Sequence, residues 1–351
     1  WRWSLDVFYH HVFTNDKAIA DLAKEVDWPV KVKNPVTTSF IHEKEIQLDT
    51  PLSVLKFGPV SVWGRMRMGV GLMLLKLIPN GKFLEKYQVV KVLPKLIGKE
   101  AYETIWEKML RAKFGPYTEK VNMAWFWTRV AKRTQKLGYF EGGFQQLIEK
   151  TEEKILSNGG VIRKKTKVEK IEQNSQEKWV VNGEVFDGLV MTTPAPVTEK
   201  ILGEKIIFPK IDYLWGQTMV LELNHKLIKG YWMNILEKEW PFLVCVEHTN
   251  MIDKKNYDNH RIVYLGNYLP GDDKQLKMTK EELLGVYLPY LKRINRQFKK
   301  KWIKNIFLFR EPYAQPVFPV NYGRLLPDTR TDKKGLYLAN MSLVYPFDRG
   351  T

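Results

Sequence analysis

Two pairs of adjacent side chains, His10-His11 and Glu247-His248, are of the types that bind metals or transfer protons. Successive side chains of a strand point to opposite faces, so His10 and His11 cannot share a metal ion on the strand predicted there. Glu247-His248 also lies in a predicted strand, without a further ligand at metal-binding spacing, which favours a structural histidine. The sequence therefore predicts no metal site.

Motifs in which side chains carry out catalysis by themselves are missing from the sequence. It contains no His-Glu-x-x-His, no Cys-x-x-Cys, no Gly-x-Ser-x-Gly and no Walker loop. Gly69-Val70-Gly71 begins like a dinucleotide loop, but Leu74 replaces the third glycine and no predicted strand precedes it. The sequence thus indicates that a bound cofactor supplies the chemistry.

The middle of the chain alternates helix and strand, as an α/β domain does. An amphipathic helix ends at Asn158-Gly159-Gly160, which is typical of a left-handed C-cap. Val161–Ile171 is predicted to be a strand, and Asn182-Gly183 is predicted to be the turn of a hairpin. Leu189–Met191 is a buried strand that runs into the polar turn Thr192-Thr193-Pro194.

The flanking regions have different patterns. Leu5–Phe13 is predicted to be an aromatic strand, and Pro51–Leu137 is mainly helical. Consecutive strands between Thr218 and Tyr268 predict an antiparallel sheet, and Gly335–Ala339 is a last buried strand. The sequence thus predicts an α/β fold in which a helical segment and an antiparallel sheet interrupt the alternating part.

Composition restricts the class of protein and its partners. The chain has 351 residues, 44% of them hydrophobic, which suggests about two domains with complete cores. Its net charge of +17 comes mostly from lysines spread over the whole length. A solvated surface explains them best, ahead of an acidic ligand or membrane, and ahead of nucleic acid. The single cysteine, Cys245, excludes an intrachain disulfide and suits a reducing, cytoplasmic setting.

One apolar run raises the question of a membrane. Met68–Leu75 is uninterrupted, but it falls well short of the ~20 residues that a spanning helix needs. Arg65, Arg67 and Lys76 flank the run, as in a helix that lies in a membrane interface. We expect burial in the helical segment instead, while a peripheral membrane contact stays open.

Four stretches, in order along nearly the whole chain, resemble the flavoprotein superfamily of amine oxidases, protoporphyrinogen oxidases, phytoene desaturases and UDP-galactopyranose mutase. His11-Val12-Phe13 is similar to the family's His-x-Phe element beside the flavin ring. Val161–Ile171 resembles the strand whose valine, here Val168, holds the adenine. Leu189–Pro194 resembles the strand and turn at the pyrophosphate, and Gly335–Thr351 resembles the C-terminal flavin-binding signature.

The resemblance implies FAD as the cofactor, in a split Rossmann-like domain made of residues 1–15, 138–212 and 333–351. The substrate-binding domain, with its helical subdomain, would be residues 16–137 and 213–332. Two catalytic residues are implied: His11, which orients substrate or flavin, and Arg349, which offsets negative charge on the reduced ring. The residues implied to bind the cofactor are Val168, Thr192, Thr193, Pro194, Asp348, Arg349, Gly350 and Thr351.

One part of the family's pattern is not found in the sequence. The family begins with a strand, a Gly-x-Gly-x-x-Gly turn and a helix, followed by an acidic residue for the ribose. We expect this βαβ unit to precede Trp1 in the complete protein. Without it, the chain is expected to bind FAD weakly or not at all.

The activity implied by the resemblance is oxidation of an organic substrate that gives hydride or electrons to the flavin. A redox-neutral flavoenzyme of the mutase type and a basic binding protein without a cofactor remain as alternatives. The expected partner is a small-molecule substrate and not a nucleic acid, and the oligomeric state is not predicted. Five aromatic residues could line an apolar pocket, but packing in the core is favoured for each of them: Trp125, Phe126, Trp127, Tyr231 and Trp232.

Overall fold

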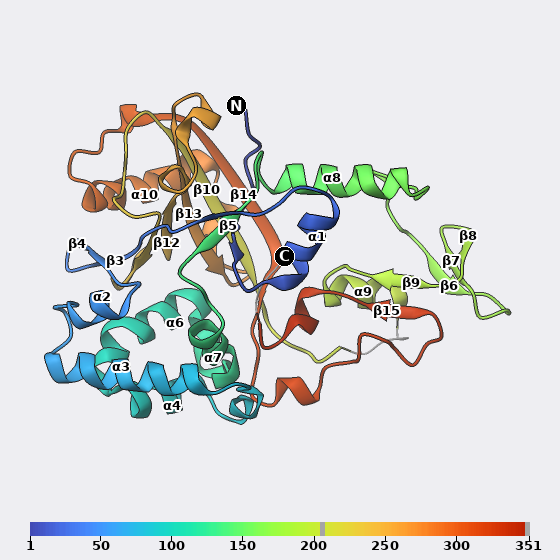
Figure 1. Ribbon diagram of the computed structural model, residues 1–351, viewed down its shortest axis with the longest axis horizontal. Helices are drawn as coiled ribbons and strands as arrows, with labels where there is room; N and C mark the ends of the chain where they lie inside the picture. The colour runs from blue at the N-terminus through green and yellow to red at the C-terminus, as the bar shows by residue number, and fades with distance from the viewer. Residues whose placement is uncertain (204–207, 348–351) are drawn as a thin grey trace.

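A seven-stranded sheet forms the centre of the computed structural model, which describes residues 1–203 and 208–347 (Figure 1). Neighbouring strands are antiparallel except β11 and β3, which run parallel. In order across the sheet, the strands are β14 (Ile303–Pro316), β10 (Tyr213–Leu223), β13 (Arg261–Leu269), β12 (Val244–Glu247), β11 (Trp232–Ile235), β3 (Thr37–Ile41) and β4 (Lys44–Gln47).

The central strands of this sheet are buried on both faces, because their apolar side chains alternate between two cores. In β10, Met219 and Leu221 point into one core, and Val220 points into the other. The first core lies under α10 (Lys280–Ile294), which begins with a capping box between Thr279 and Glu282.

The N-terminal part of the chain covers the second face. A small antiparallel sheet there has the order β1 (Val12–Phe13), β5 (Leu137–Tyr139), β2 (Lys31–Lys33). It packs, together with the end of α1 (Lys17–Glu25), in one core with Val244 and Ile262 of the large sheet. From β5 the chain continues into α8 (Phe144–Ser157), which leads away from the large sheet (Figure 1).

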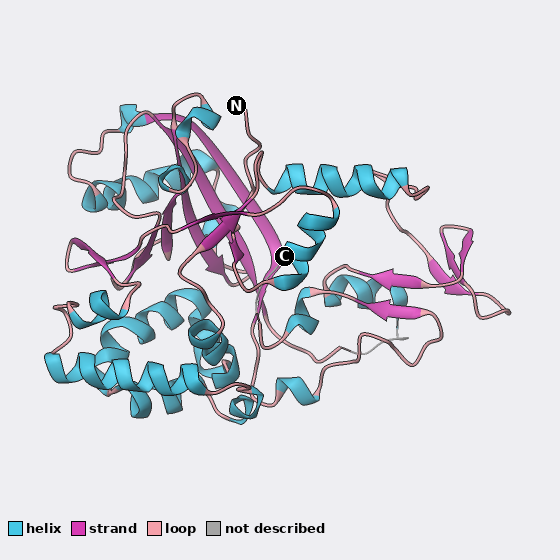
Figure 2. Ribbon diagram, in the orientation of Figure 1, coloured by secondary structure: helices cyan, strands magenta, loops and turns pink. Residues whose placement is uncertain are grey.

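Helices between residues 51 and 131 form a separate group at one end of the molecule (Figure 2). They are α2 (Pro51–Leu55), α3 (Val62–Leu77), α4 (Val89–Ile97), α5 (Lys99–Ala101), α6 (Glu107–Phe114) and α7 (Met123–Ala131). Their core contains Trp125, Phe126 and Trp127, each at most 3% exposed, so these residues pack as the sequence favoured. Among the described residues, no helix combines the length and the apolar character needed to cross a membrane.

A smaller unit lies at the end opposite to the helical group (Figure 1). Its strands β9 (Leu189–Met191) and β15 (Leu336–Leu338) run parallel, and α9 (Ala195–Leu202) packs with them around Trp179. Beside them is a three-stranded antiparallel sheet of β6 (Ile171–Gln173), β7 (Trp179–Val181) and β8 (Glu184–Phe186). The predicted turn at Asn182-Gly183 is confirmed, with φ of 48° and 89°.

The α/β fold class is confirmed, but two predicted strands are wrong in extent. Residues 161–170 are loop, and the strand predicted over Val161–Ile171 begins only at Ile171. No strand of the described chain pairs with this loop; instead, the Asn182 side chain accepts a hydrogen bond from the Glu169 amide at 2.9 Å. The strand predicted over Leu5–Phe13 is reduced to Val12–Phe13, because the chain bends at Val7 and Phe8 and the His10 amide donates locally to the Phe8 carbonyl at 2.9 Å.

Candidate cofactor and active site

An aromatic wall stands where the N-terminal segment crosses the large sheet. The Tyr9 and Trp232 rings meet edge to face with centroids 5.1 Å apart, and the His11 ring lies 5.8 Å from Trp232. His11 also contacts the Phe13 ring at 5.1 Å. Tyr9, His11 and Phe13 therefore form this wall together with Trp232 of β11, although only Phe13 among the first three lies in a strand.

Two glycines of the large sheet make room for this segment. A Cβ atom on Gly266 would lie 2.3 Å from the Tyr9 ring, and one on Gly216 would lie 3.0 Å from the Phe8 ring. Larger residues would push the N-terminal segment off the sheet. Burial, and then the neighbouring Tyr268 hydroxyl, raises the pKa of Tyr9 well above its usual value, so Tyr9 stays neutral and available for hydrogen bonding.

The parallel pair β9–β15 ends in polar residues on a shared edge. The Ala339 amide donates to the Met191 carbonyl at 2.9 Å, which places both strand ends together. Thr192 and Pro194 are exposed there, and α9 begins directly after Pro194. Ligands of open α/β sheets bind at the carboxyl ends of parallel strands, and a helix N-terminus favours phosphate.

Asn340 adds a buried donor to this edge. Its side chain is 7% exposed, and its Oδ1 accepts a hydrogen bond from the Ser342 amide at 3.1 Å. Its Nδ2 has no hydrogen-bond partner among the described residues. A buried amide without a partner costs free energy unless a ligand accepts from it, so Asn340 fits a pyrophosphate acceptor. Asn340 was not among the predicted residues, although a polar residue directly after a buried strand is the same signal that selected Thr192-Thr193-Pro194.

Residues near the start of the chain and residues shortly before position 348 both contact the C-terminal end of α7. The Asn15 side chain donates to the Lys132 carbonyl at 2.9 Å, and Arg133 lies 5.6 Å from the Phe13 ring. Within α7, the Thr128 hydroxyl donates to the Pro346 carbonyl at 3.2 Å. The chain therefore brings the His-x-Phe element and the residues before position 348 to one helix end.

Some predicted site residues lie elsewhere or are not described. Asp348, Arg349, Gly350 and Thr351 fall outside the described residues. Val168 is 37% exposed and sits in the loop before β6, so its prediction as a strand residue is wrong. Its role as an adenine contact stays a prediction.

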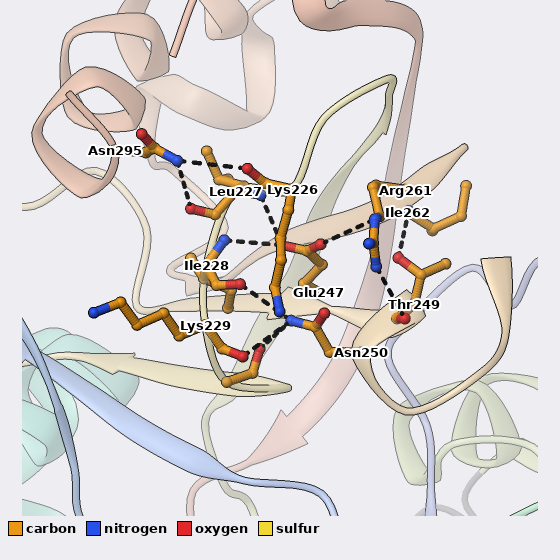
Figure 3. A network of polar contacts seen from close by, with 11 residues as sticks. Lys226, Leu227, Ile228, Lys229, Glu247, Thr249, Asn250, Arg261, Ile262 and Asn295 are labelled. Atoms are coloured by element: carbon orange, nitrogen blue, oxygen red, sulfur yellow. Dashed lines mark hydrogen bonds and ion pairs between the residues drawn. The ribbon is translucent and has the colours of Figure 1, made fainter. Parts of the chain in front are cut away.

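Two buried polar groups turn out to be structural. Burial lowers the pKa of His248 to about 3, and its Nε2 is 2.9 Å from the Tyr257 hydroxyl, as expected for a satisfied histidine. Glu247 accepts hydrogen bonds from the Leu227 and Ile228 amides at 2.9 and 2.8 Å (Figure 3). No cluster of three or more metal-binding side chains occurs in the part of the chain that the structure describes.

An edge at the carboxyl ends of parallel strands, combined with an aromatic wall and a large sheet, is typical of α/β proteins that bind a small-molecule ligand or a cofactor. The chain belongs to the family of flavin-containing amine oxidoreductases, whose model matches residues 3–345. It is therefore an oxidoreductase of a flavin-using family. No curated protein sequence matches the chain.

Solved structures support the same fold at low sequence identity. A candidate protoporphyrinogen oxidase from Exiguobacterium sp. 255-15 is 15% identical, with a TM-score of 0.71 over 97% of this chain and 83% of that chain. Putrescine oxidase bound to putrescine is 12% identical, with a TM-score of 0.65 and coverage of 97% and 83%. Reduced UDP-galactopyranose mutase is 12% identical, with a TM-score of 0.67 and coverage of 92% and 76%.

Proposed function

We propose that the flavin is FAD and that the protein removes hydride or electrons from a small organic molecule. The observation that carries this proposal is the shared edge of β9 and β15, where the polar turn and the start of α9 follow one strand and Asn340, with its buried Nδ2 donor, follows the other. These donors suit the two phosphates of a dinucleotide. Bound flavin would supply reversible acceptance of hydride, and the chain would supply orientation and exclusion of water.

Each part of the chain has a role in this proposal. Residues 1–15, 138–212 and 333–351 would hold the cofactor, and residues 16–137 and 213–332 would hold the substrate. His11, within the aromatic wall, would orient substrate or flavin by a hydrogen bond, and Arg349 would offset negative charge on the reduced ring. The remaining proposed cofactor contacts are Val168, Thr192, Thr193, Pro194, Asp348, Gly350 and Thr351.

The wall also indicates what kind of substrate fits. Tyr9, Phe13 and Trp232 offer ring faces and edges, which favour an apolar or aromatic part of a substrate. The buried single cysteine, Cys245, suits a reducing compartment, and we place the enzyme in the cytoplasm.

Replacing Asn340 by Asp tests the cofactor edge. An Asp side chain keeps the oxygen that caps Ser342, but it replaces the Nδ2 donor by a carboxylate oxygen. In the complete gene product, N340D should weaken FAD binding about tenfold or more, since a donor to a charged group is lost and like charges meet. Fluorescence titration with FAD measures this effect.

The matched control is Asn80→Asp, the same change of charge at an exposed turn of the helical group, where the side-chain oxygen likewise accepts from a backbone amide, that of Lys82. It should leave FAD affinity within about twofold, because exposed charges at a distance are screened. Equal FAD affinity of N340D and the unchanged protein would remove this edge from the cofactor site, and absence of FAD binding in the unchanged protein would overturn the FAD proposal.

The absorbance of the flavin distinguishes an oxidoreductase from the mutase-like alternative. Under anaerobic conditions, a substrate that the enzyme oxidises, such as an amine or a porphyrinogen, bleaches the yellow absorption band because it reduces the flavin. A redox-neutral enzyme turns over a nucleotide sugar and leaves the oxidation state of the flavin unchanged. Bleaching by a substrate of the first class supports the oxidoreductase proposal.

A further inference from the structure

We propose that the outward face of α3 docks on the surface of an anionic lipid membrane. α3 is apolar on two sides, and only one side packs in the protein, through Met68, Gly71 and Leu75. The other side consists of exposed apolar residues, which we call the docking face. It comprises Val62 (60% exposed), Trp63 (79%), Met66 (50%), Val70 (53%), Met73 (55%), Leu74 (49%) and Leu77 (69%).

The docking face is a continuous stripe, not a scatter of residues. At about 100° of turn per residue, its members fall within an arc of about 120°. The buried residues Met68, Gly71 and Leu75 lie on the opposite side of the same helix. α2 packs beside α3 and adds two more apolar side chains, Leu52 at 60% and Leu55 at 54% exposed.

This pattern differs from that of an ordinary surface helix. A helix on the outside of a globular protein normally turns a polar face to water, and a helix that is apolar all round is normally covered on all sides. Contiguous exposed apolar patches mark contact sites with proteins or membranes. Trp63, the most exposed member, is a residue type that settles at the boundary of headgroups and acyl chains.

The charges around the docking face identify its partner. Arg67 borders the stripe on one side, and Arg65 and Lys76 border it on the other. The two guanidinium groups are held at the border by backbone carbonyls, Arg65 by that of Leu55 and Arg67 by that of Lys95. An apolar helical stripe with cations along both borders complements an anionic lipid surface.

A second copy of this chain fits the face less well. α3 contains no Asp or Glu, and Glu100, the carboxylate at its first turn, is already hydrogen-bonded to the Ser61 amide at 2.7 Å. A two-fold contact would set the basic borders against each other. The excess of positive charge on the whole chain, +17, also favours an anionic surface.

Vesicle flotation tests this proposal without reference to the flavin. The purified chain should float with vesicles of phosphatidylcholine and phosphatidylglycerol, and much less with vesicles of phosphatidylcholine alone. Replacing Val70 and Leu74 together by Glu should lower binding to the mixed vesicles at least tenfold. The matched control replaces two other exposed valines, Val161 (77%) and Val185 (56%), by Glu and should stay within about twofold of the unchanged chain.

Two further variants separate the apolar and the charged contributions. Lys76→Ser should lower binding to the anionic vesicles about fivefold, as expected for one cation near a charged membrane. Trp63→Phe should retain binding, but it should remove most of the fluorescence quenching that brominated lipids produce. Circular dichroism and thermal unfolding show whether each variant is folded.

Three results would overturn the proposal. The first is no flotation of the unchanged chain with anionic vesicles. The second is equal loss of binding in the docking-face variant and its Val161 and Val185 control. The third is a dimer in light scattering that the Val70 and Leu74 variant dissociates, without any vesicle binding by the unchanged chain; that result would assign the face to a second copy.

Discussion

The seven-stranded sheet and the β9–β15 pair are built from similar apolar strands, but only in the large sheet are the central strands covered by other parts of the chain on both faces. In β10, every residue from Gly216 to Leu223 is buried, because cores lie on both faces. In the small pair, Val190 and Tyr337 are 57% and 37% exposed on neighbouring strands. Parallel strands are normally covered on both sides, so the small unit depends more on what binds to it.

The largest predicted effect compares one buried leucine in each region. Leu265 of β13 and Leu338 of β15 are both fully buried, so the same atoms are lost when either becomes Ala. Leu265→Ala should cost about 3–5 kcal/mol of unfolding free energy, because the densely packed sheet cannot close the cavity. Leu338→Ala should cost about 2–3 kcal/mol, since a thin unit relaxes more easily. Urea denaturation measures both values.

Hydrogen exchange shows where each leucine variant loosens the protein. Leu338→Ala should speed exchange in β9, β15 and α9 while β10 and β13 stay protected. If both variants cost the same and loosen the whole chain together, the two regions form one cooperative unit and the contrast drawn between them is wrong.

Glu247, inside the large sheet, gives a pH dependence of intermediate size. Burial raises its pKa from 4.5 to about 7, against the opposing effects of the Ile228 and Leu227 amides and Arg261 (Figure 3). The folded protein therefore holds this proton more tightly than the unfolded chain. The contribution of the group to stability is complete below pH 4.5 and is lost as the pH rises toward about 7.

Over that interval, the loss should be about 1–3 kcal/mol. Glu247→Gln carries no titrating proton, so the difference between its unfolding free energy and that of the unchanged protein should vary with pH over this range. A difference that is constant with pH would show that the two backbone amides keep the carboxylate ionised throughout.

Regular patterns in the sequence predicted most of the fold. The run of consecutive strand patterns predicted β10 to β13, and the Asn182-Gly183 turn predicted the β7–β8 hairpin. These signals are local, so they do not depend on distant parts of the chain. The aromatic character of residues 5–13 was also evident in the sequence, but their contact with Trp232 of β11 is tertiary and was not predicted.

The remaining errors have physical causes. Val161–Lys170 has strand-like residues, but a strand exists only where a neighbour accepts and donates its hydrogen bonds, and sequence does not show the neighbour. β14 was missed because charged residues such as Lys304, Arg310 and Glu311 interrupt its apolar pattern. Whether the predicted residues Asp348 to Thr351 join the site is a matter of tertiary contact, which local patterns do not specify.

The smallest predicted effect tests whether surface charges hold the small unit together. Arg163 in the loop 161–170 forms an ion pair with Glu184 of β8, and both side chains are about half exposed, at 56% and 49%. Exposed pairs gain little, because water screens the charges and two long side chains lose freedom. Arg163→Ala should therefore leave the thermal unfolding midpoint within about 1 °C of the unchanged protein. A midpoint that falls by several degrees would contradict this expectation. If high salt, which screens ion pairs, leaves that difference between the variant and the unchanged protein in place, the loop is instead held to the β6–β8 sheet by packing of the Arg163 stem.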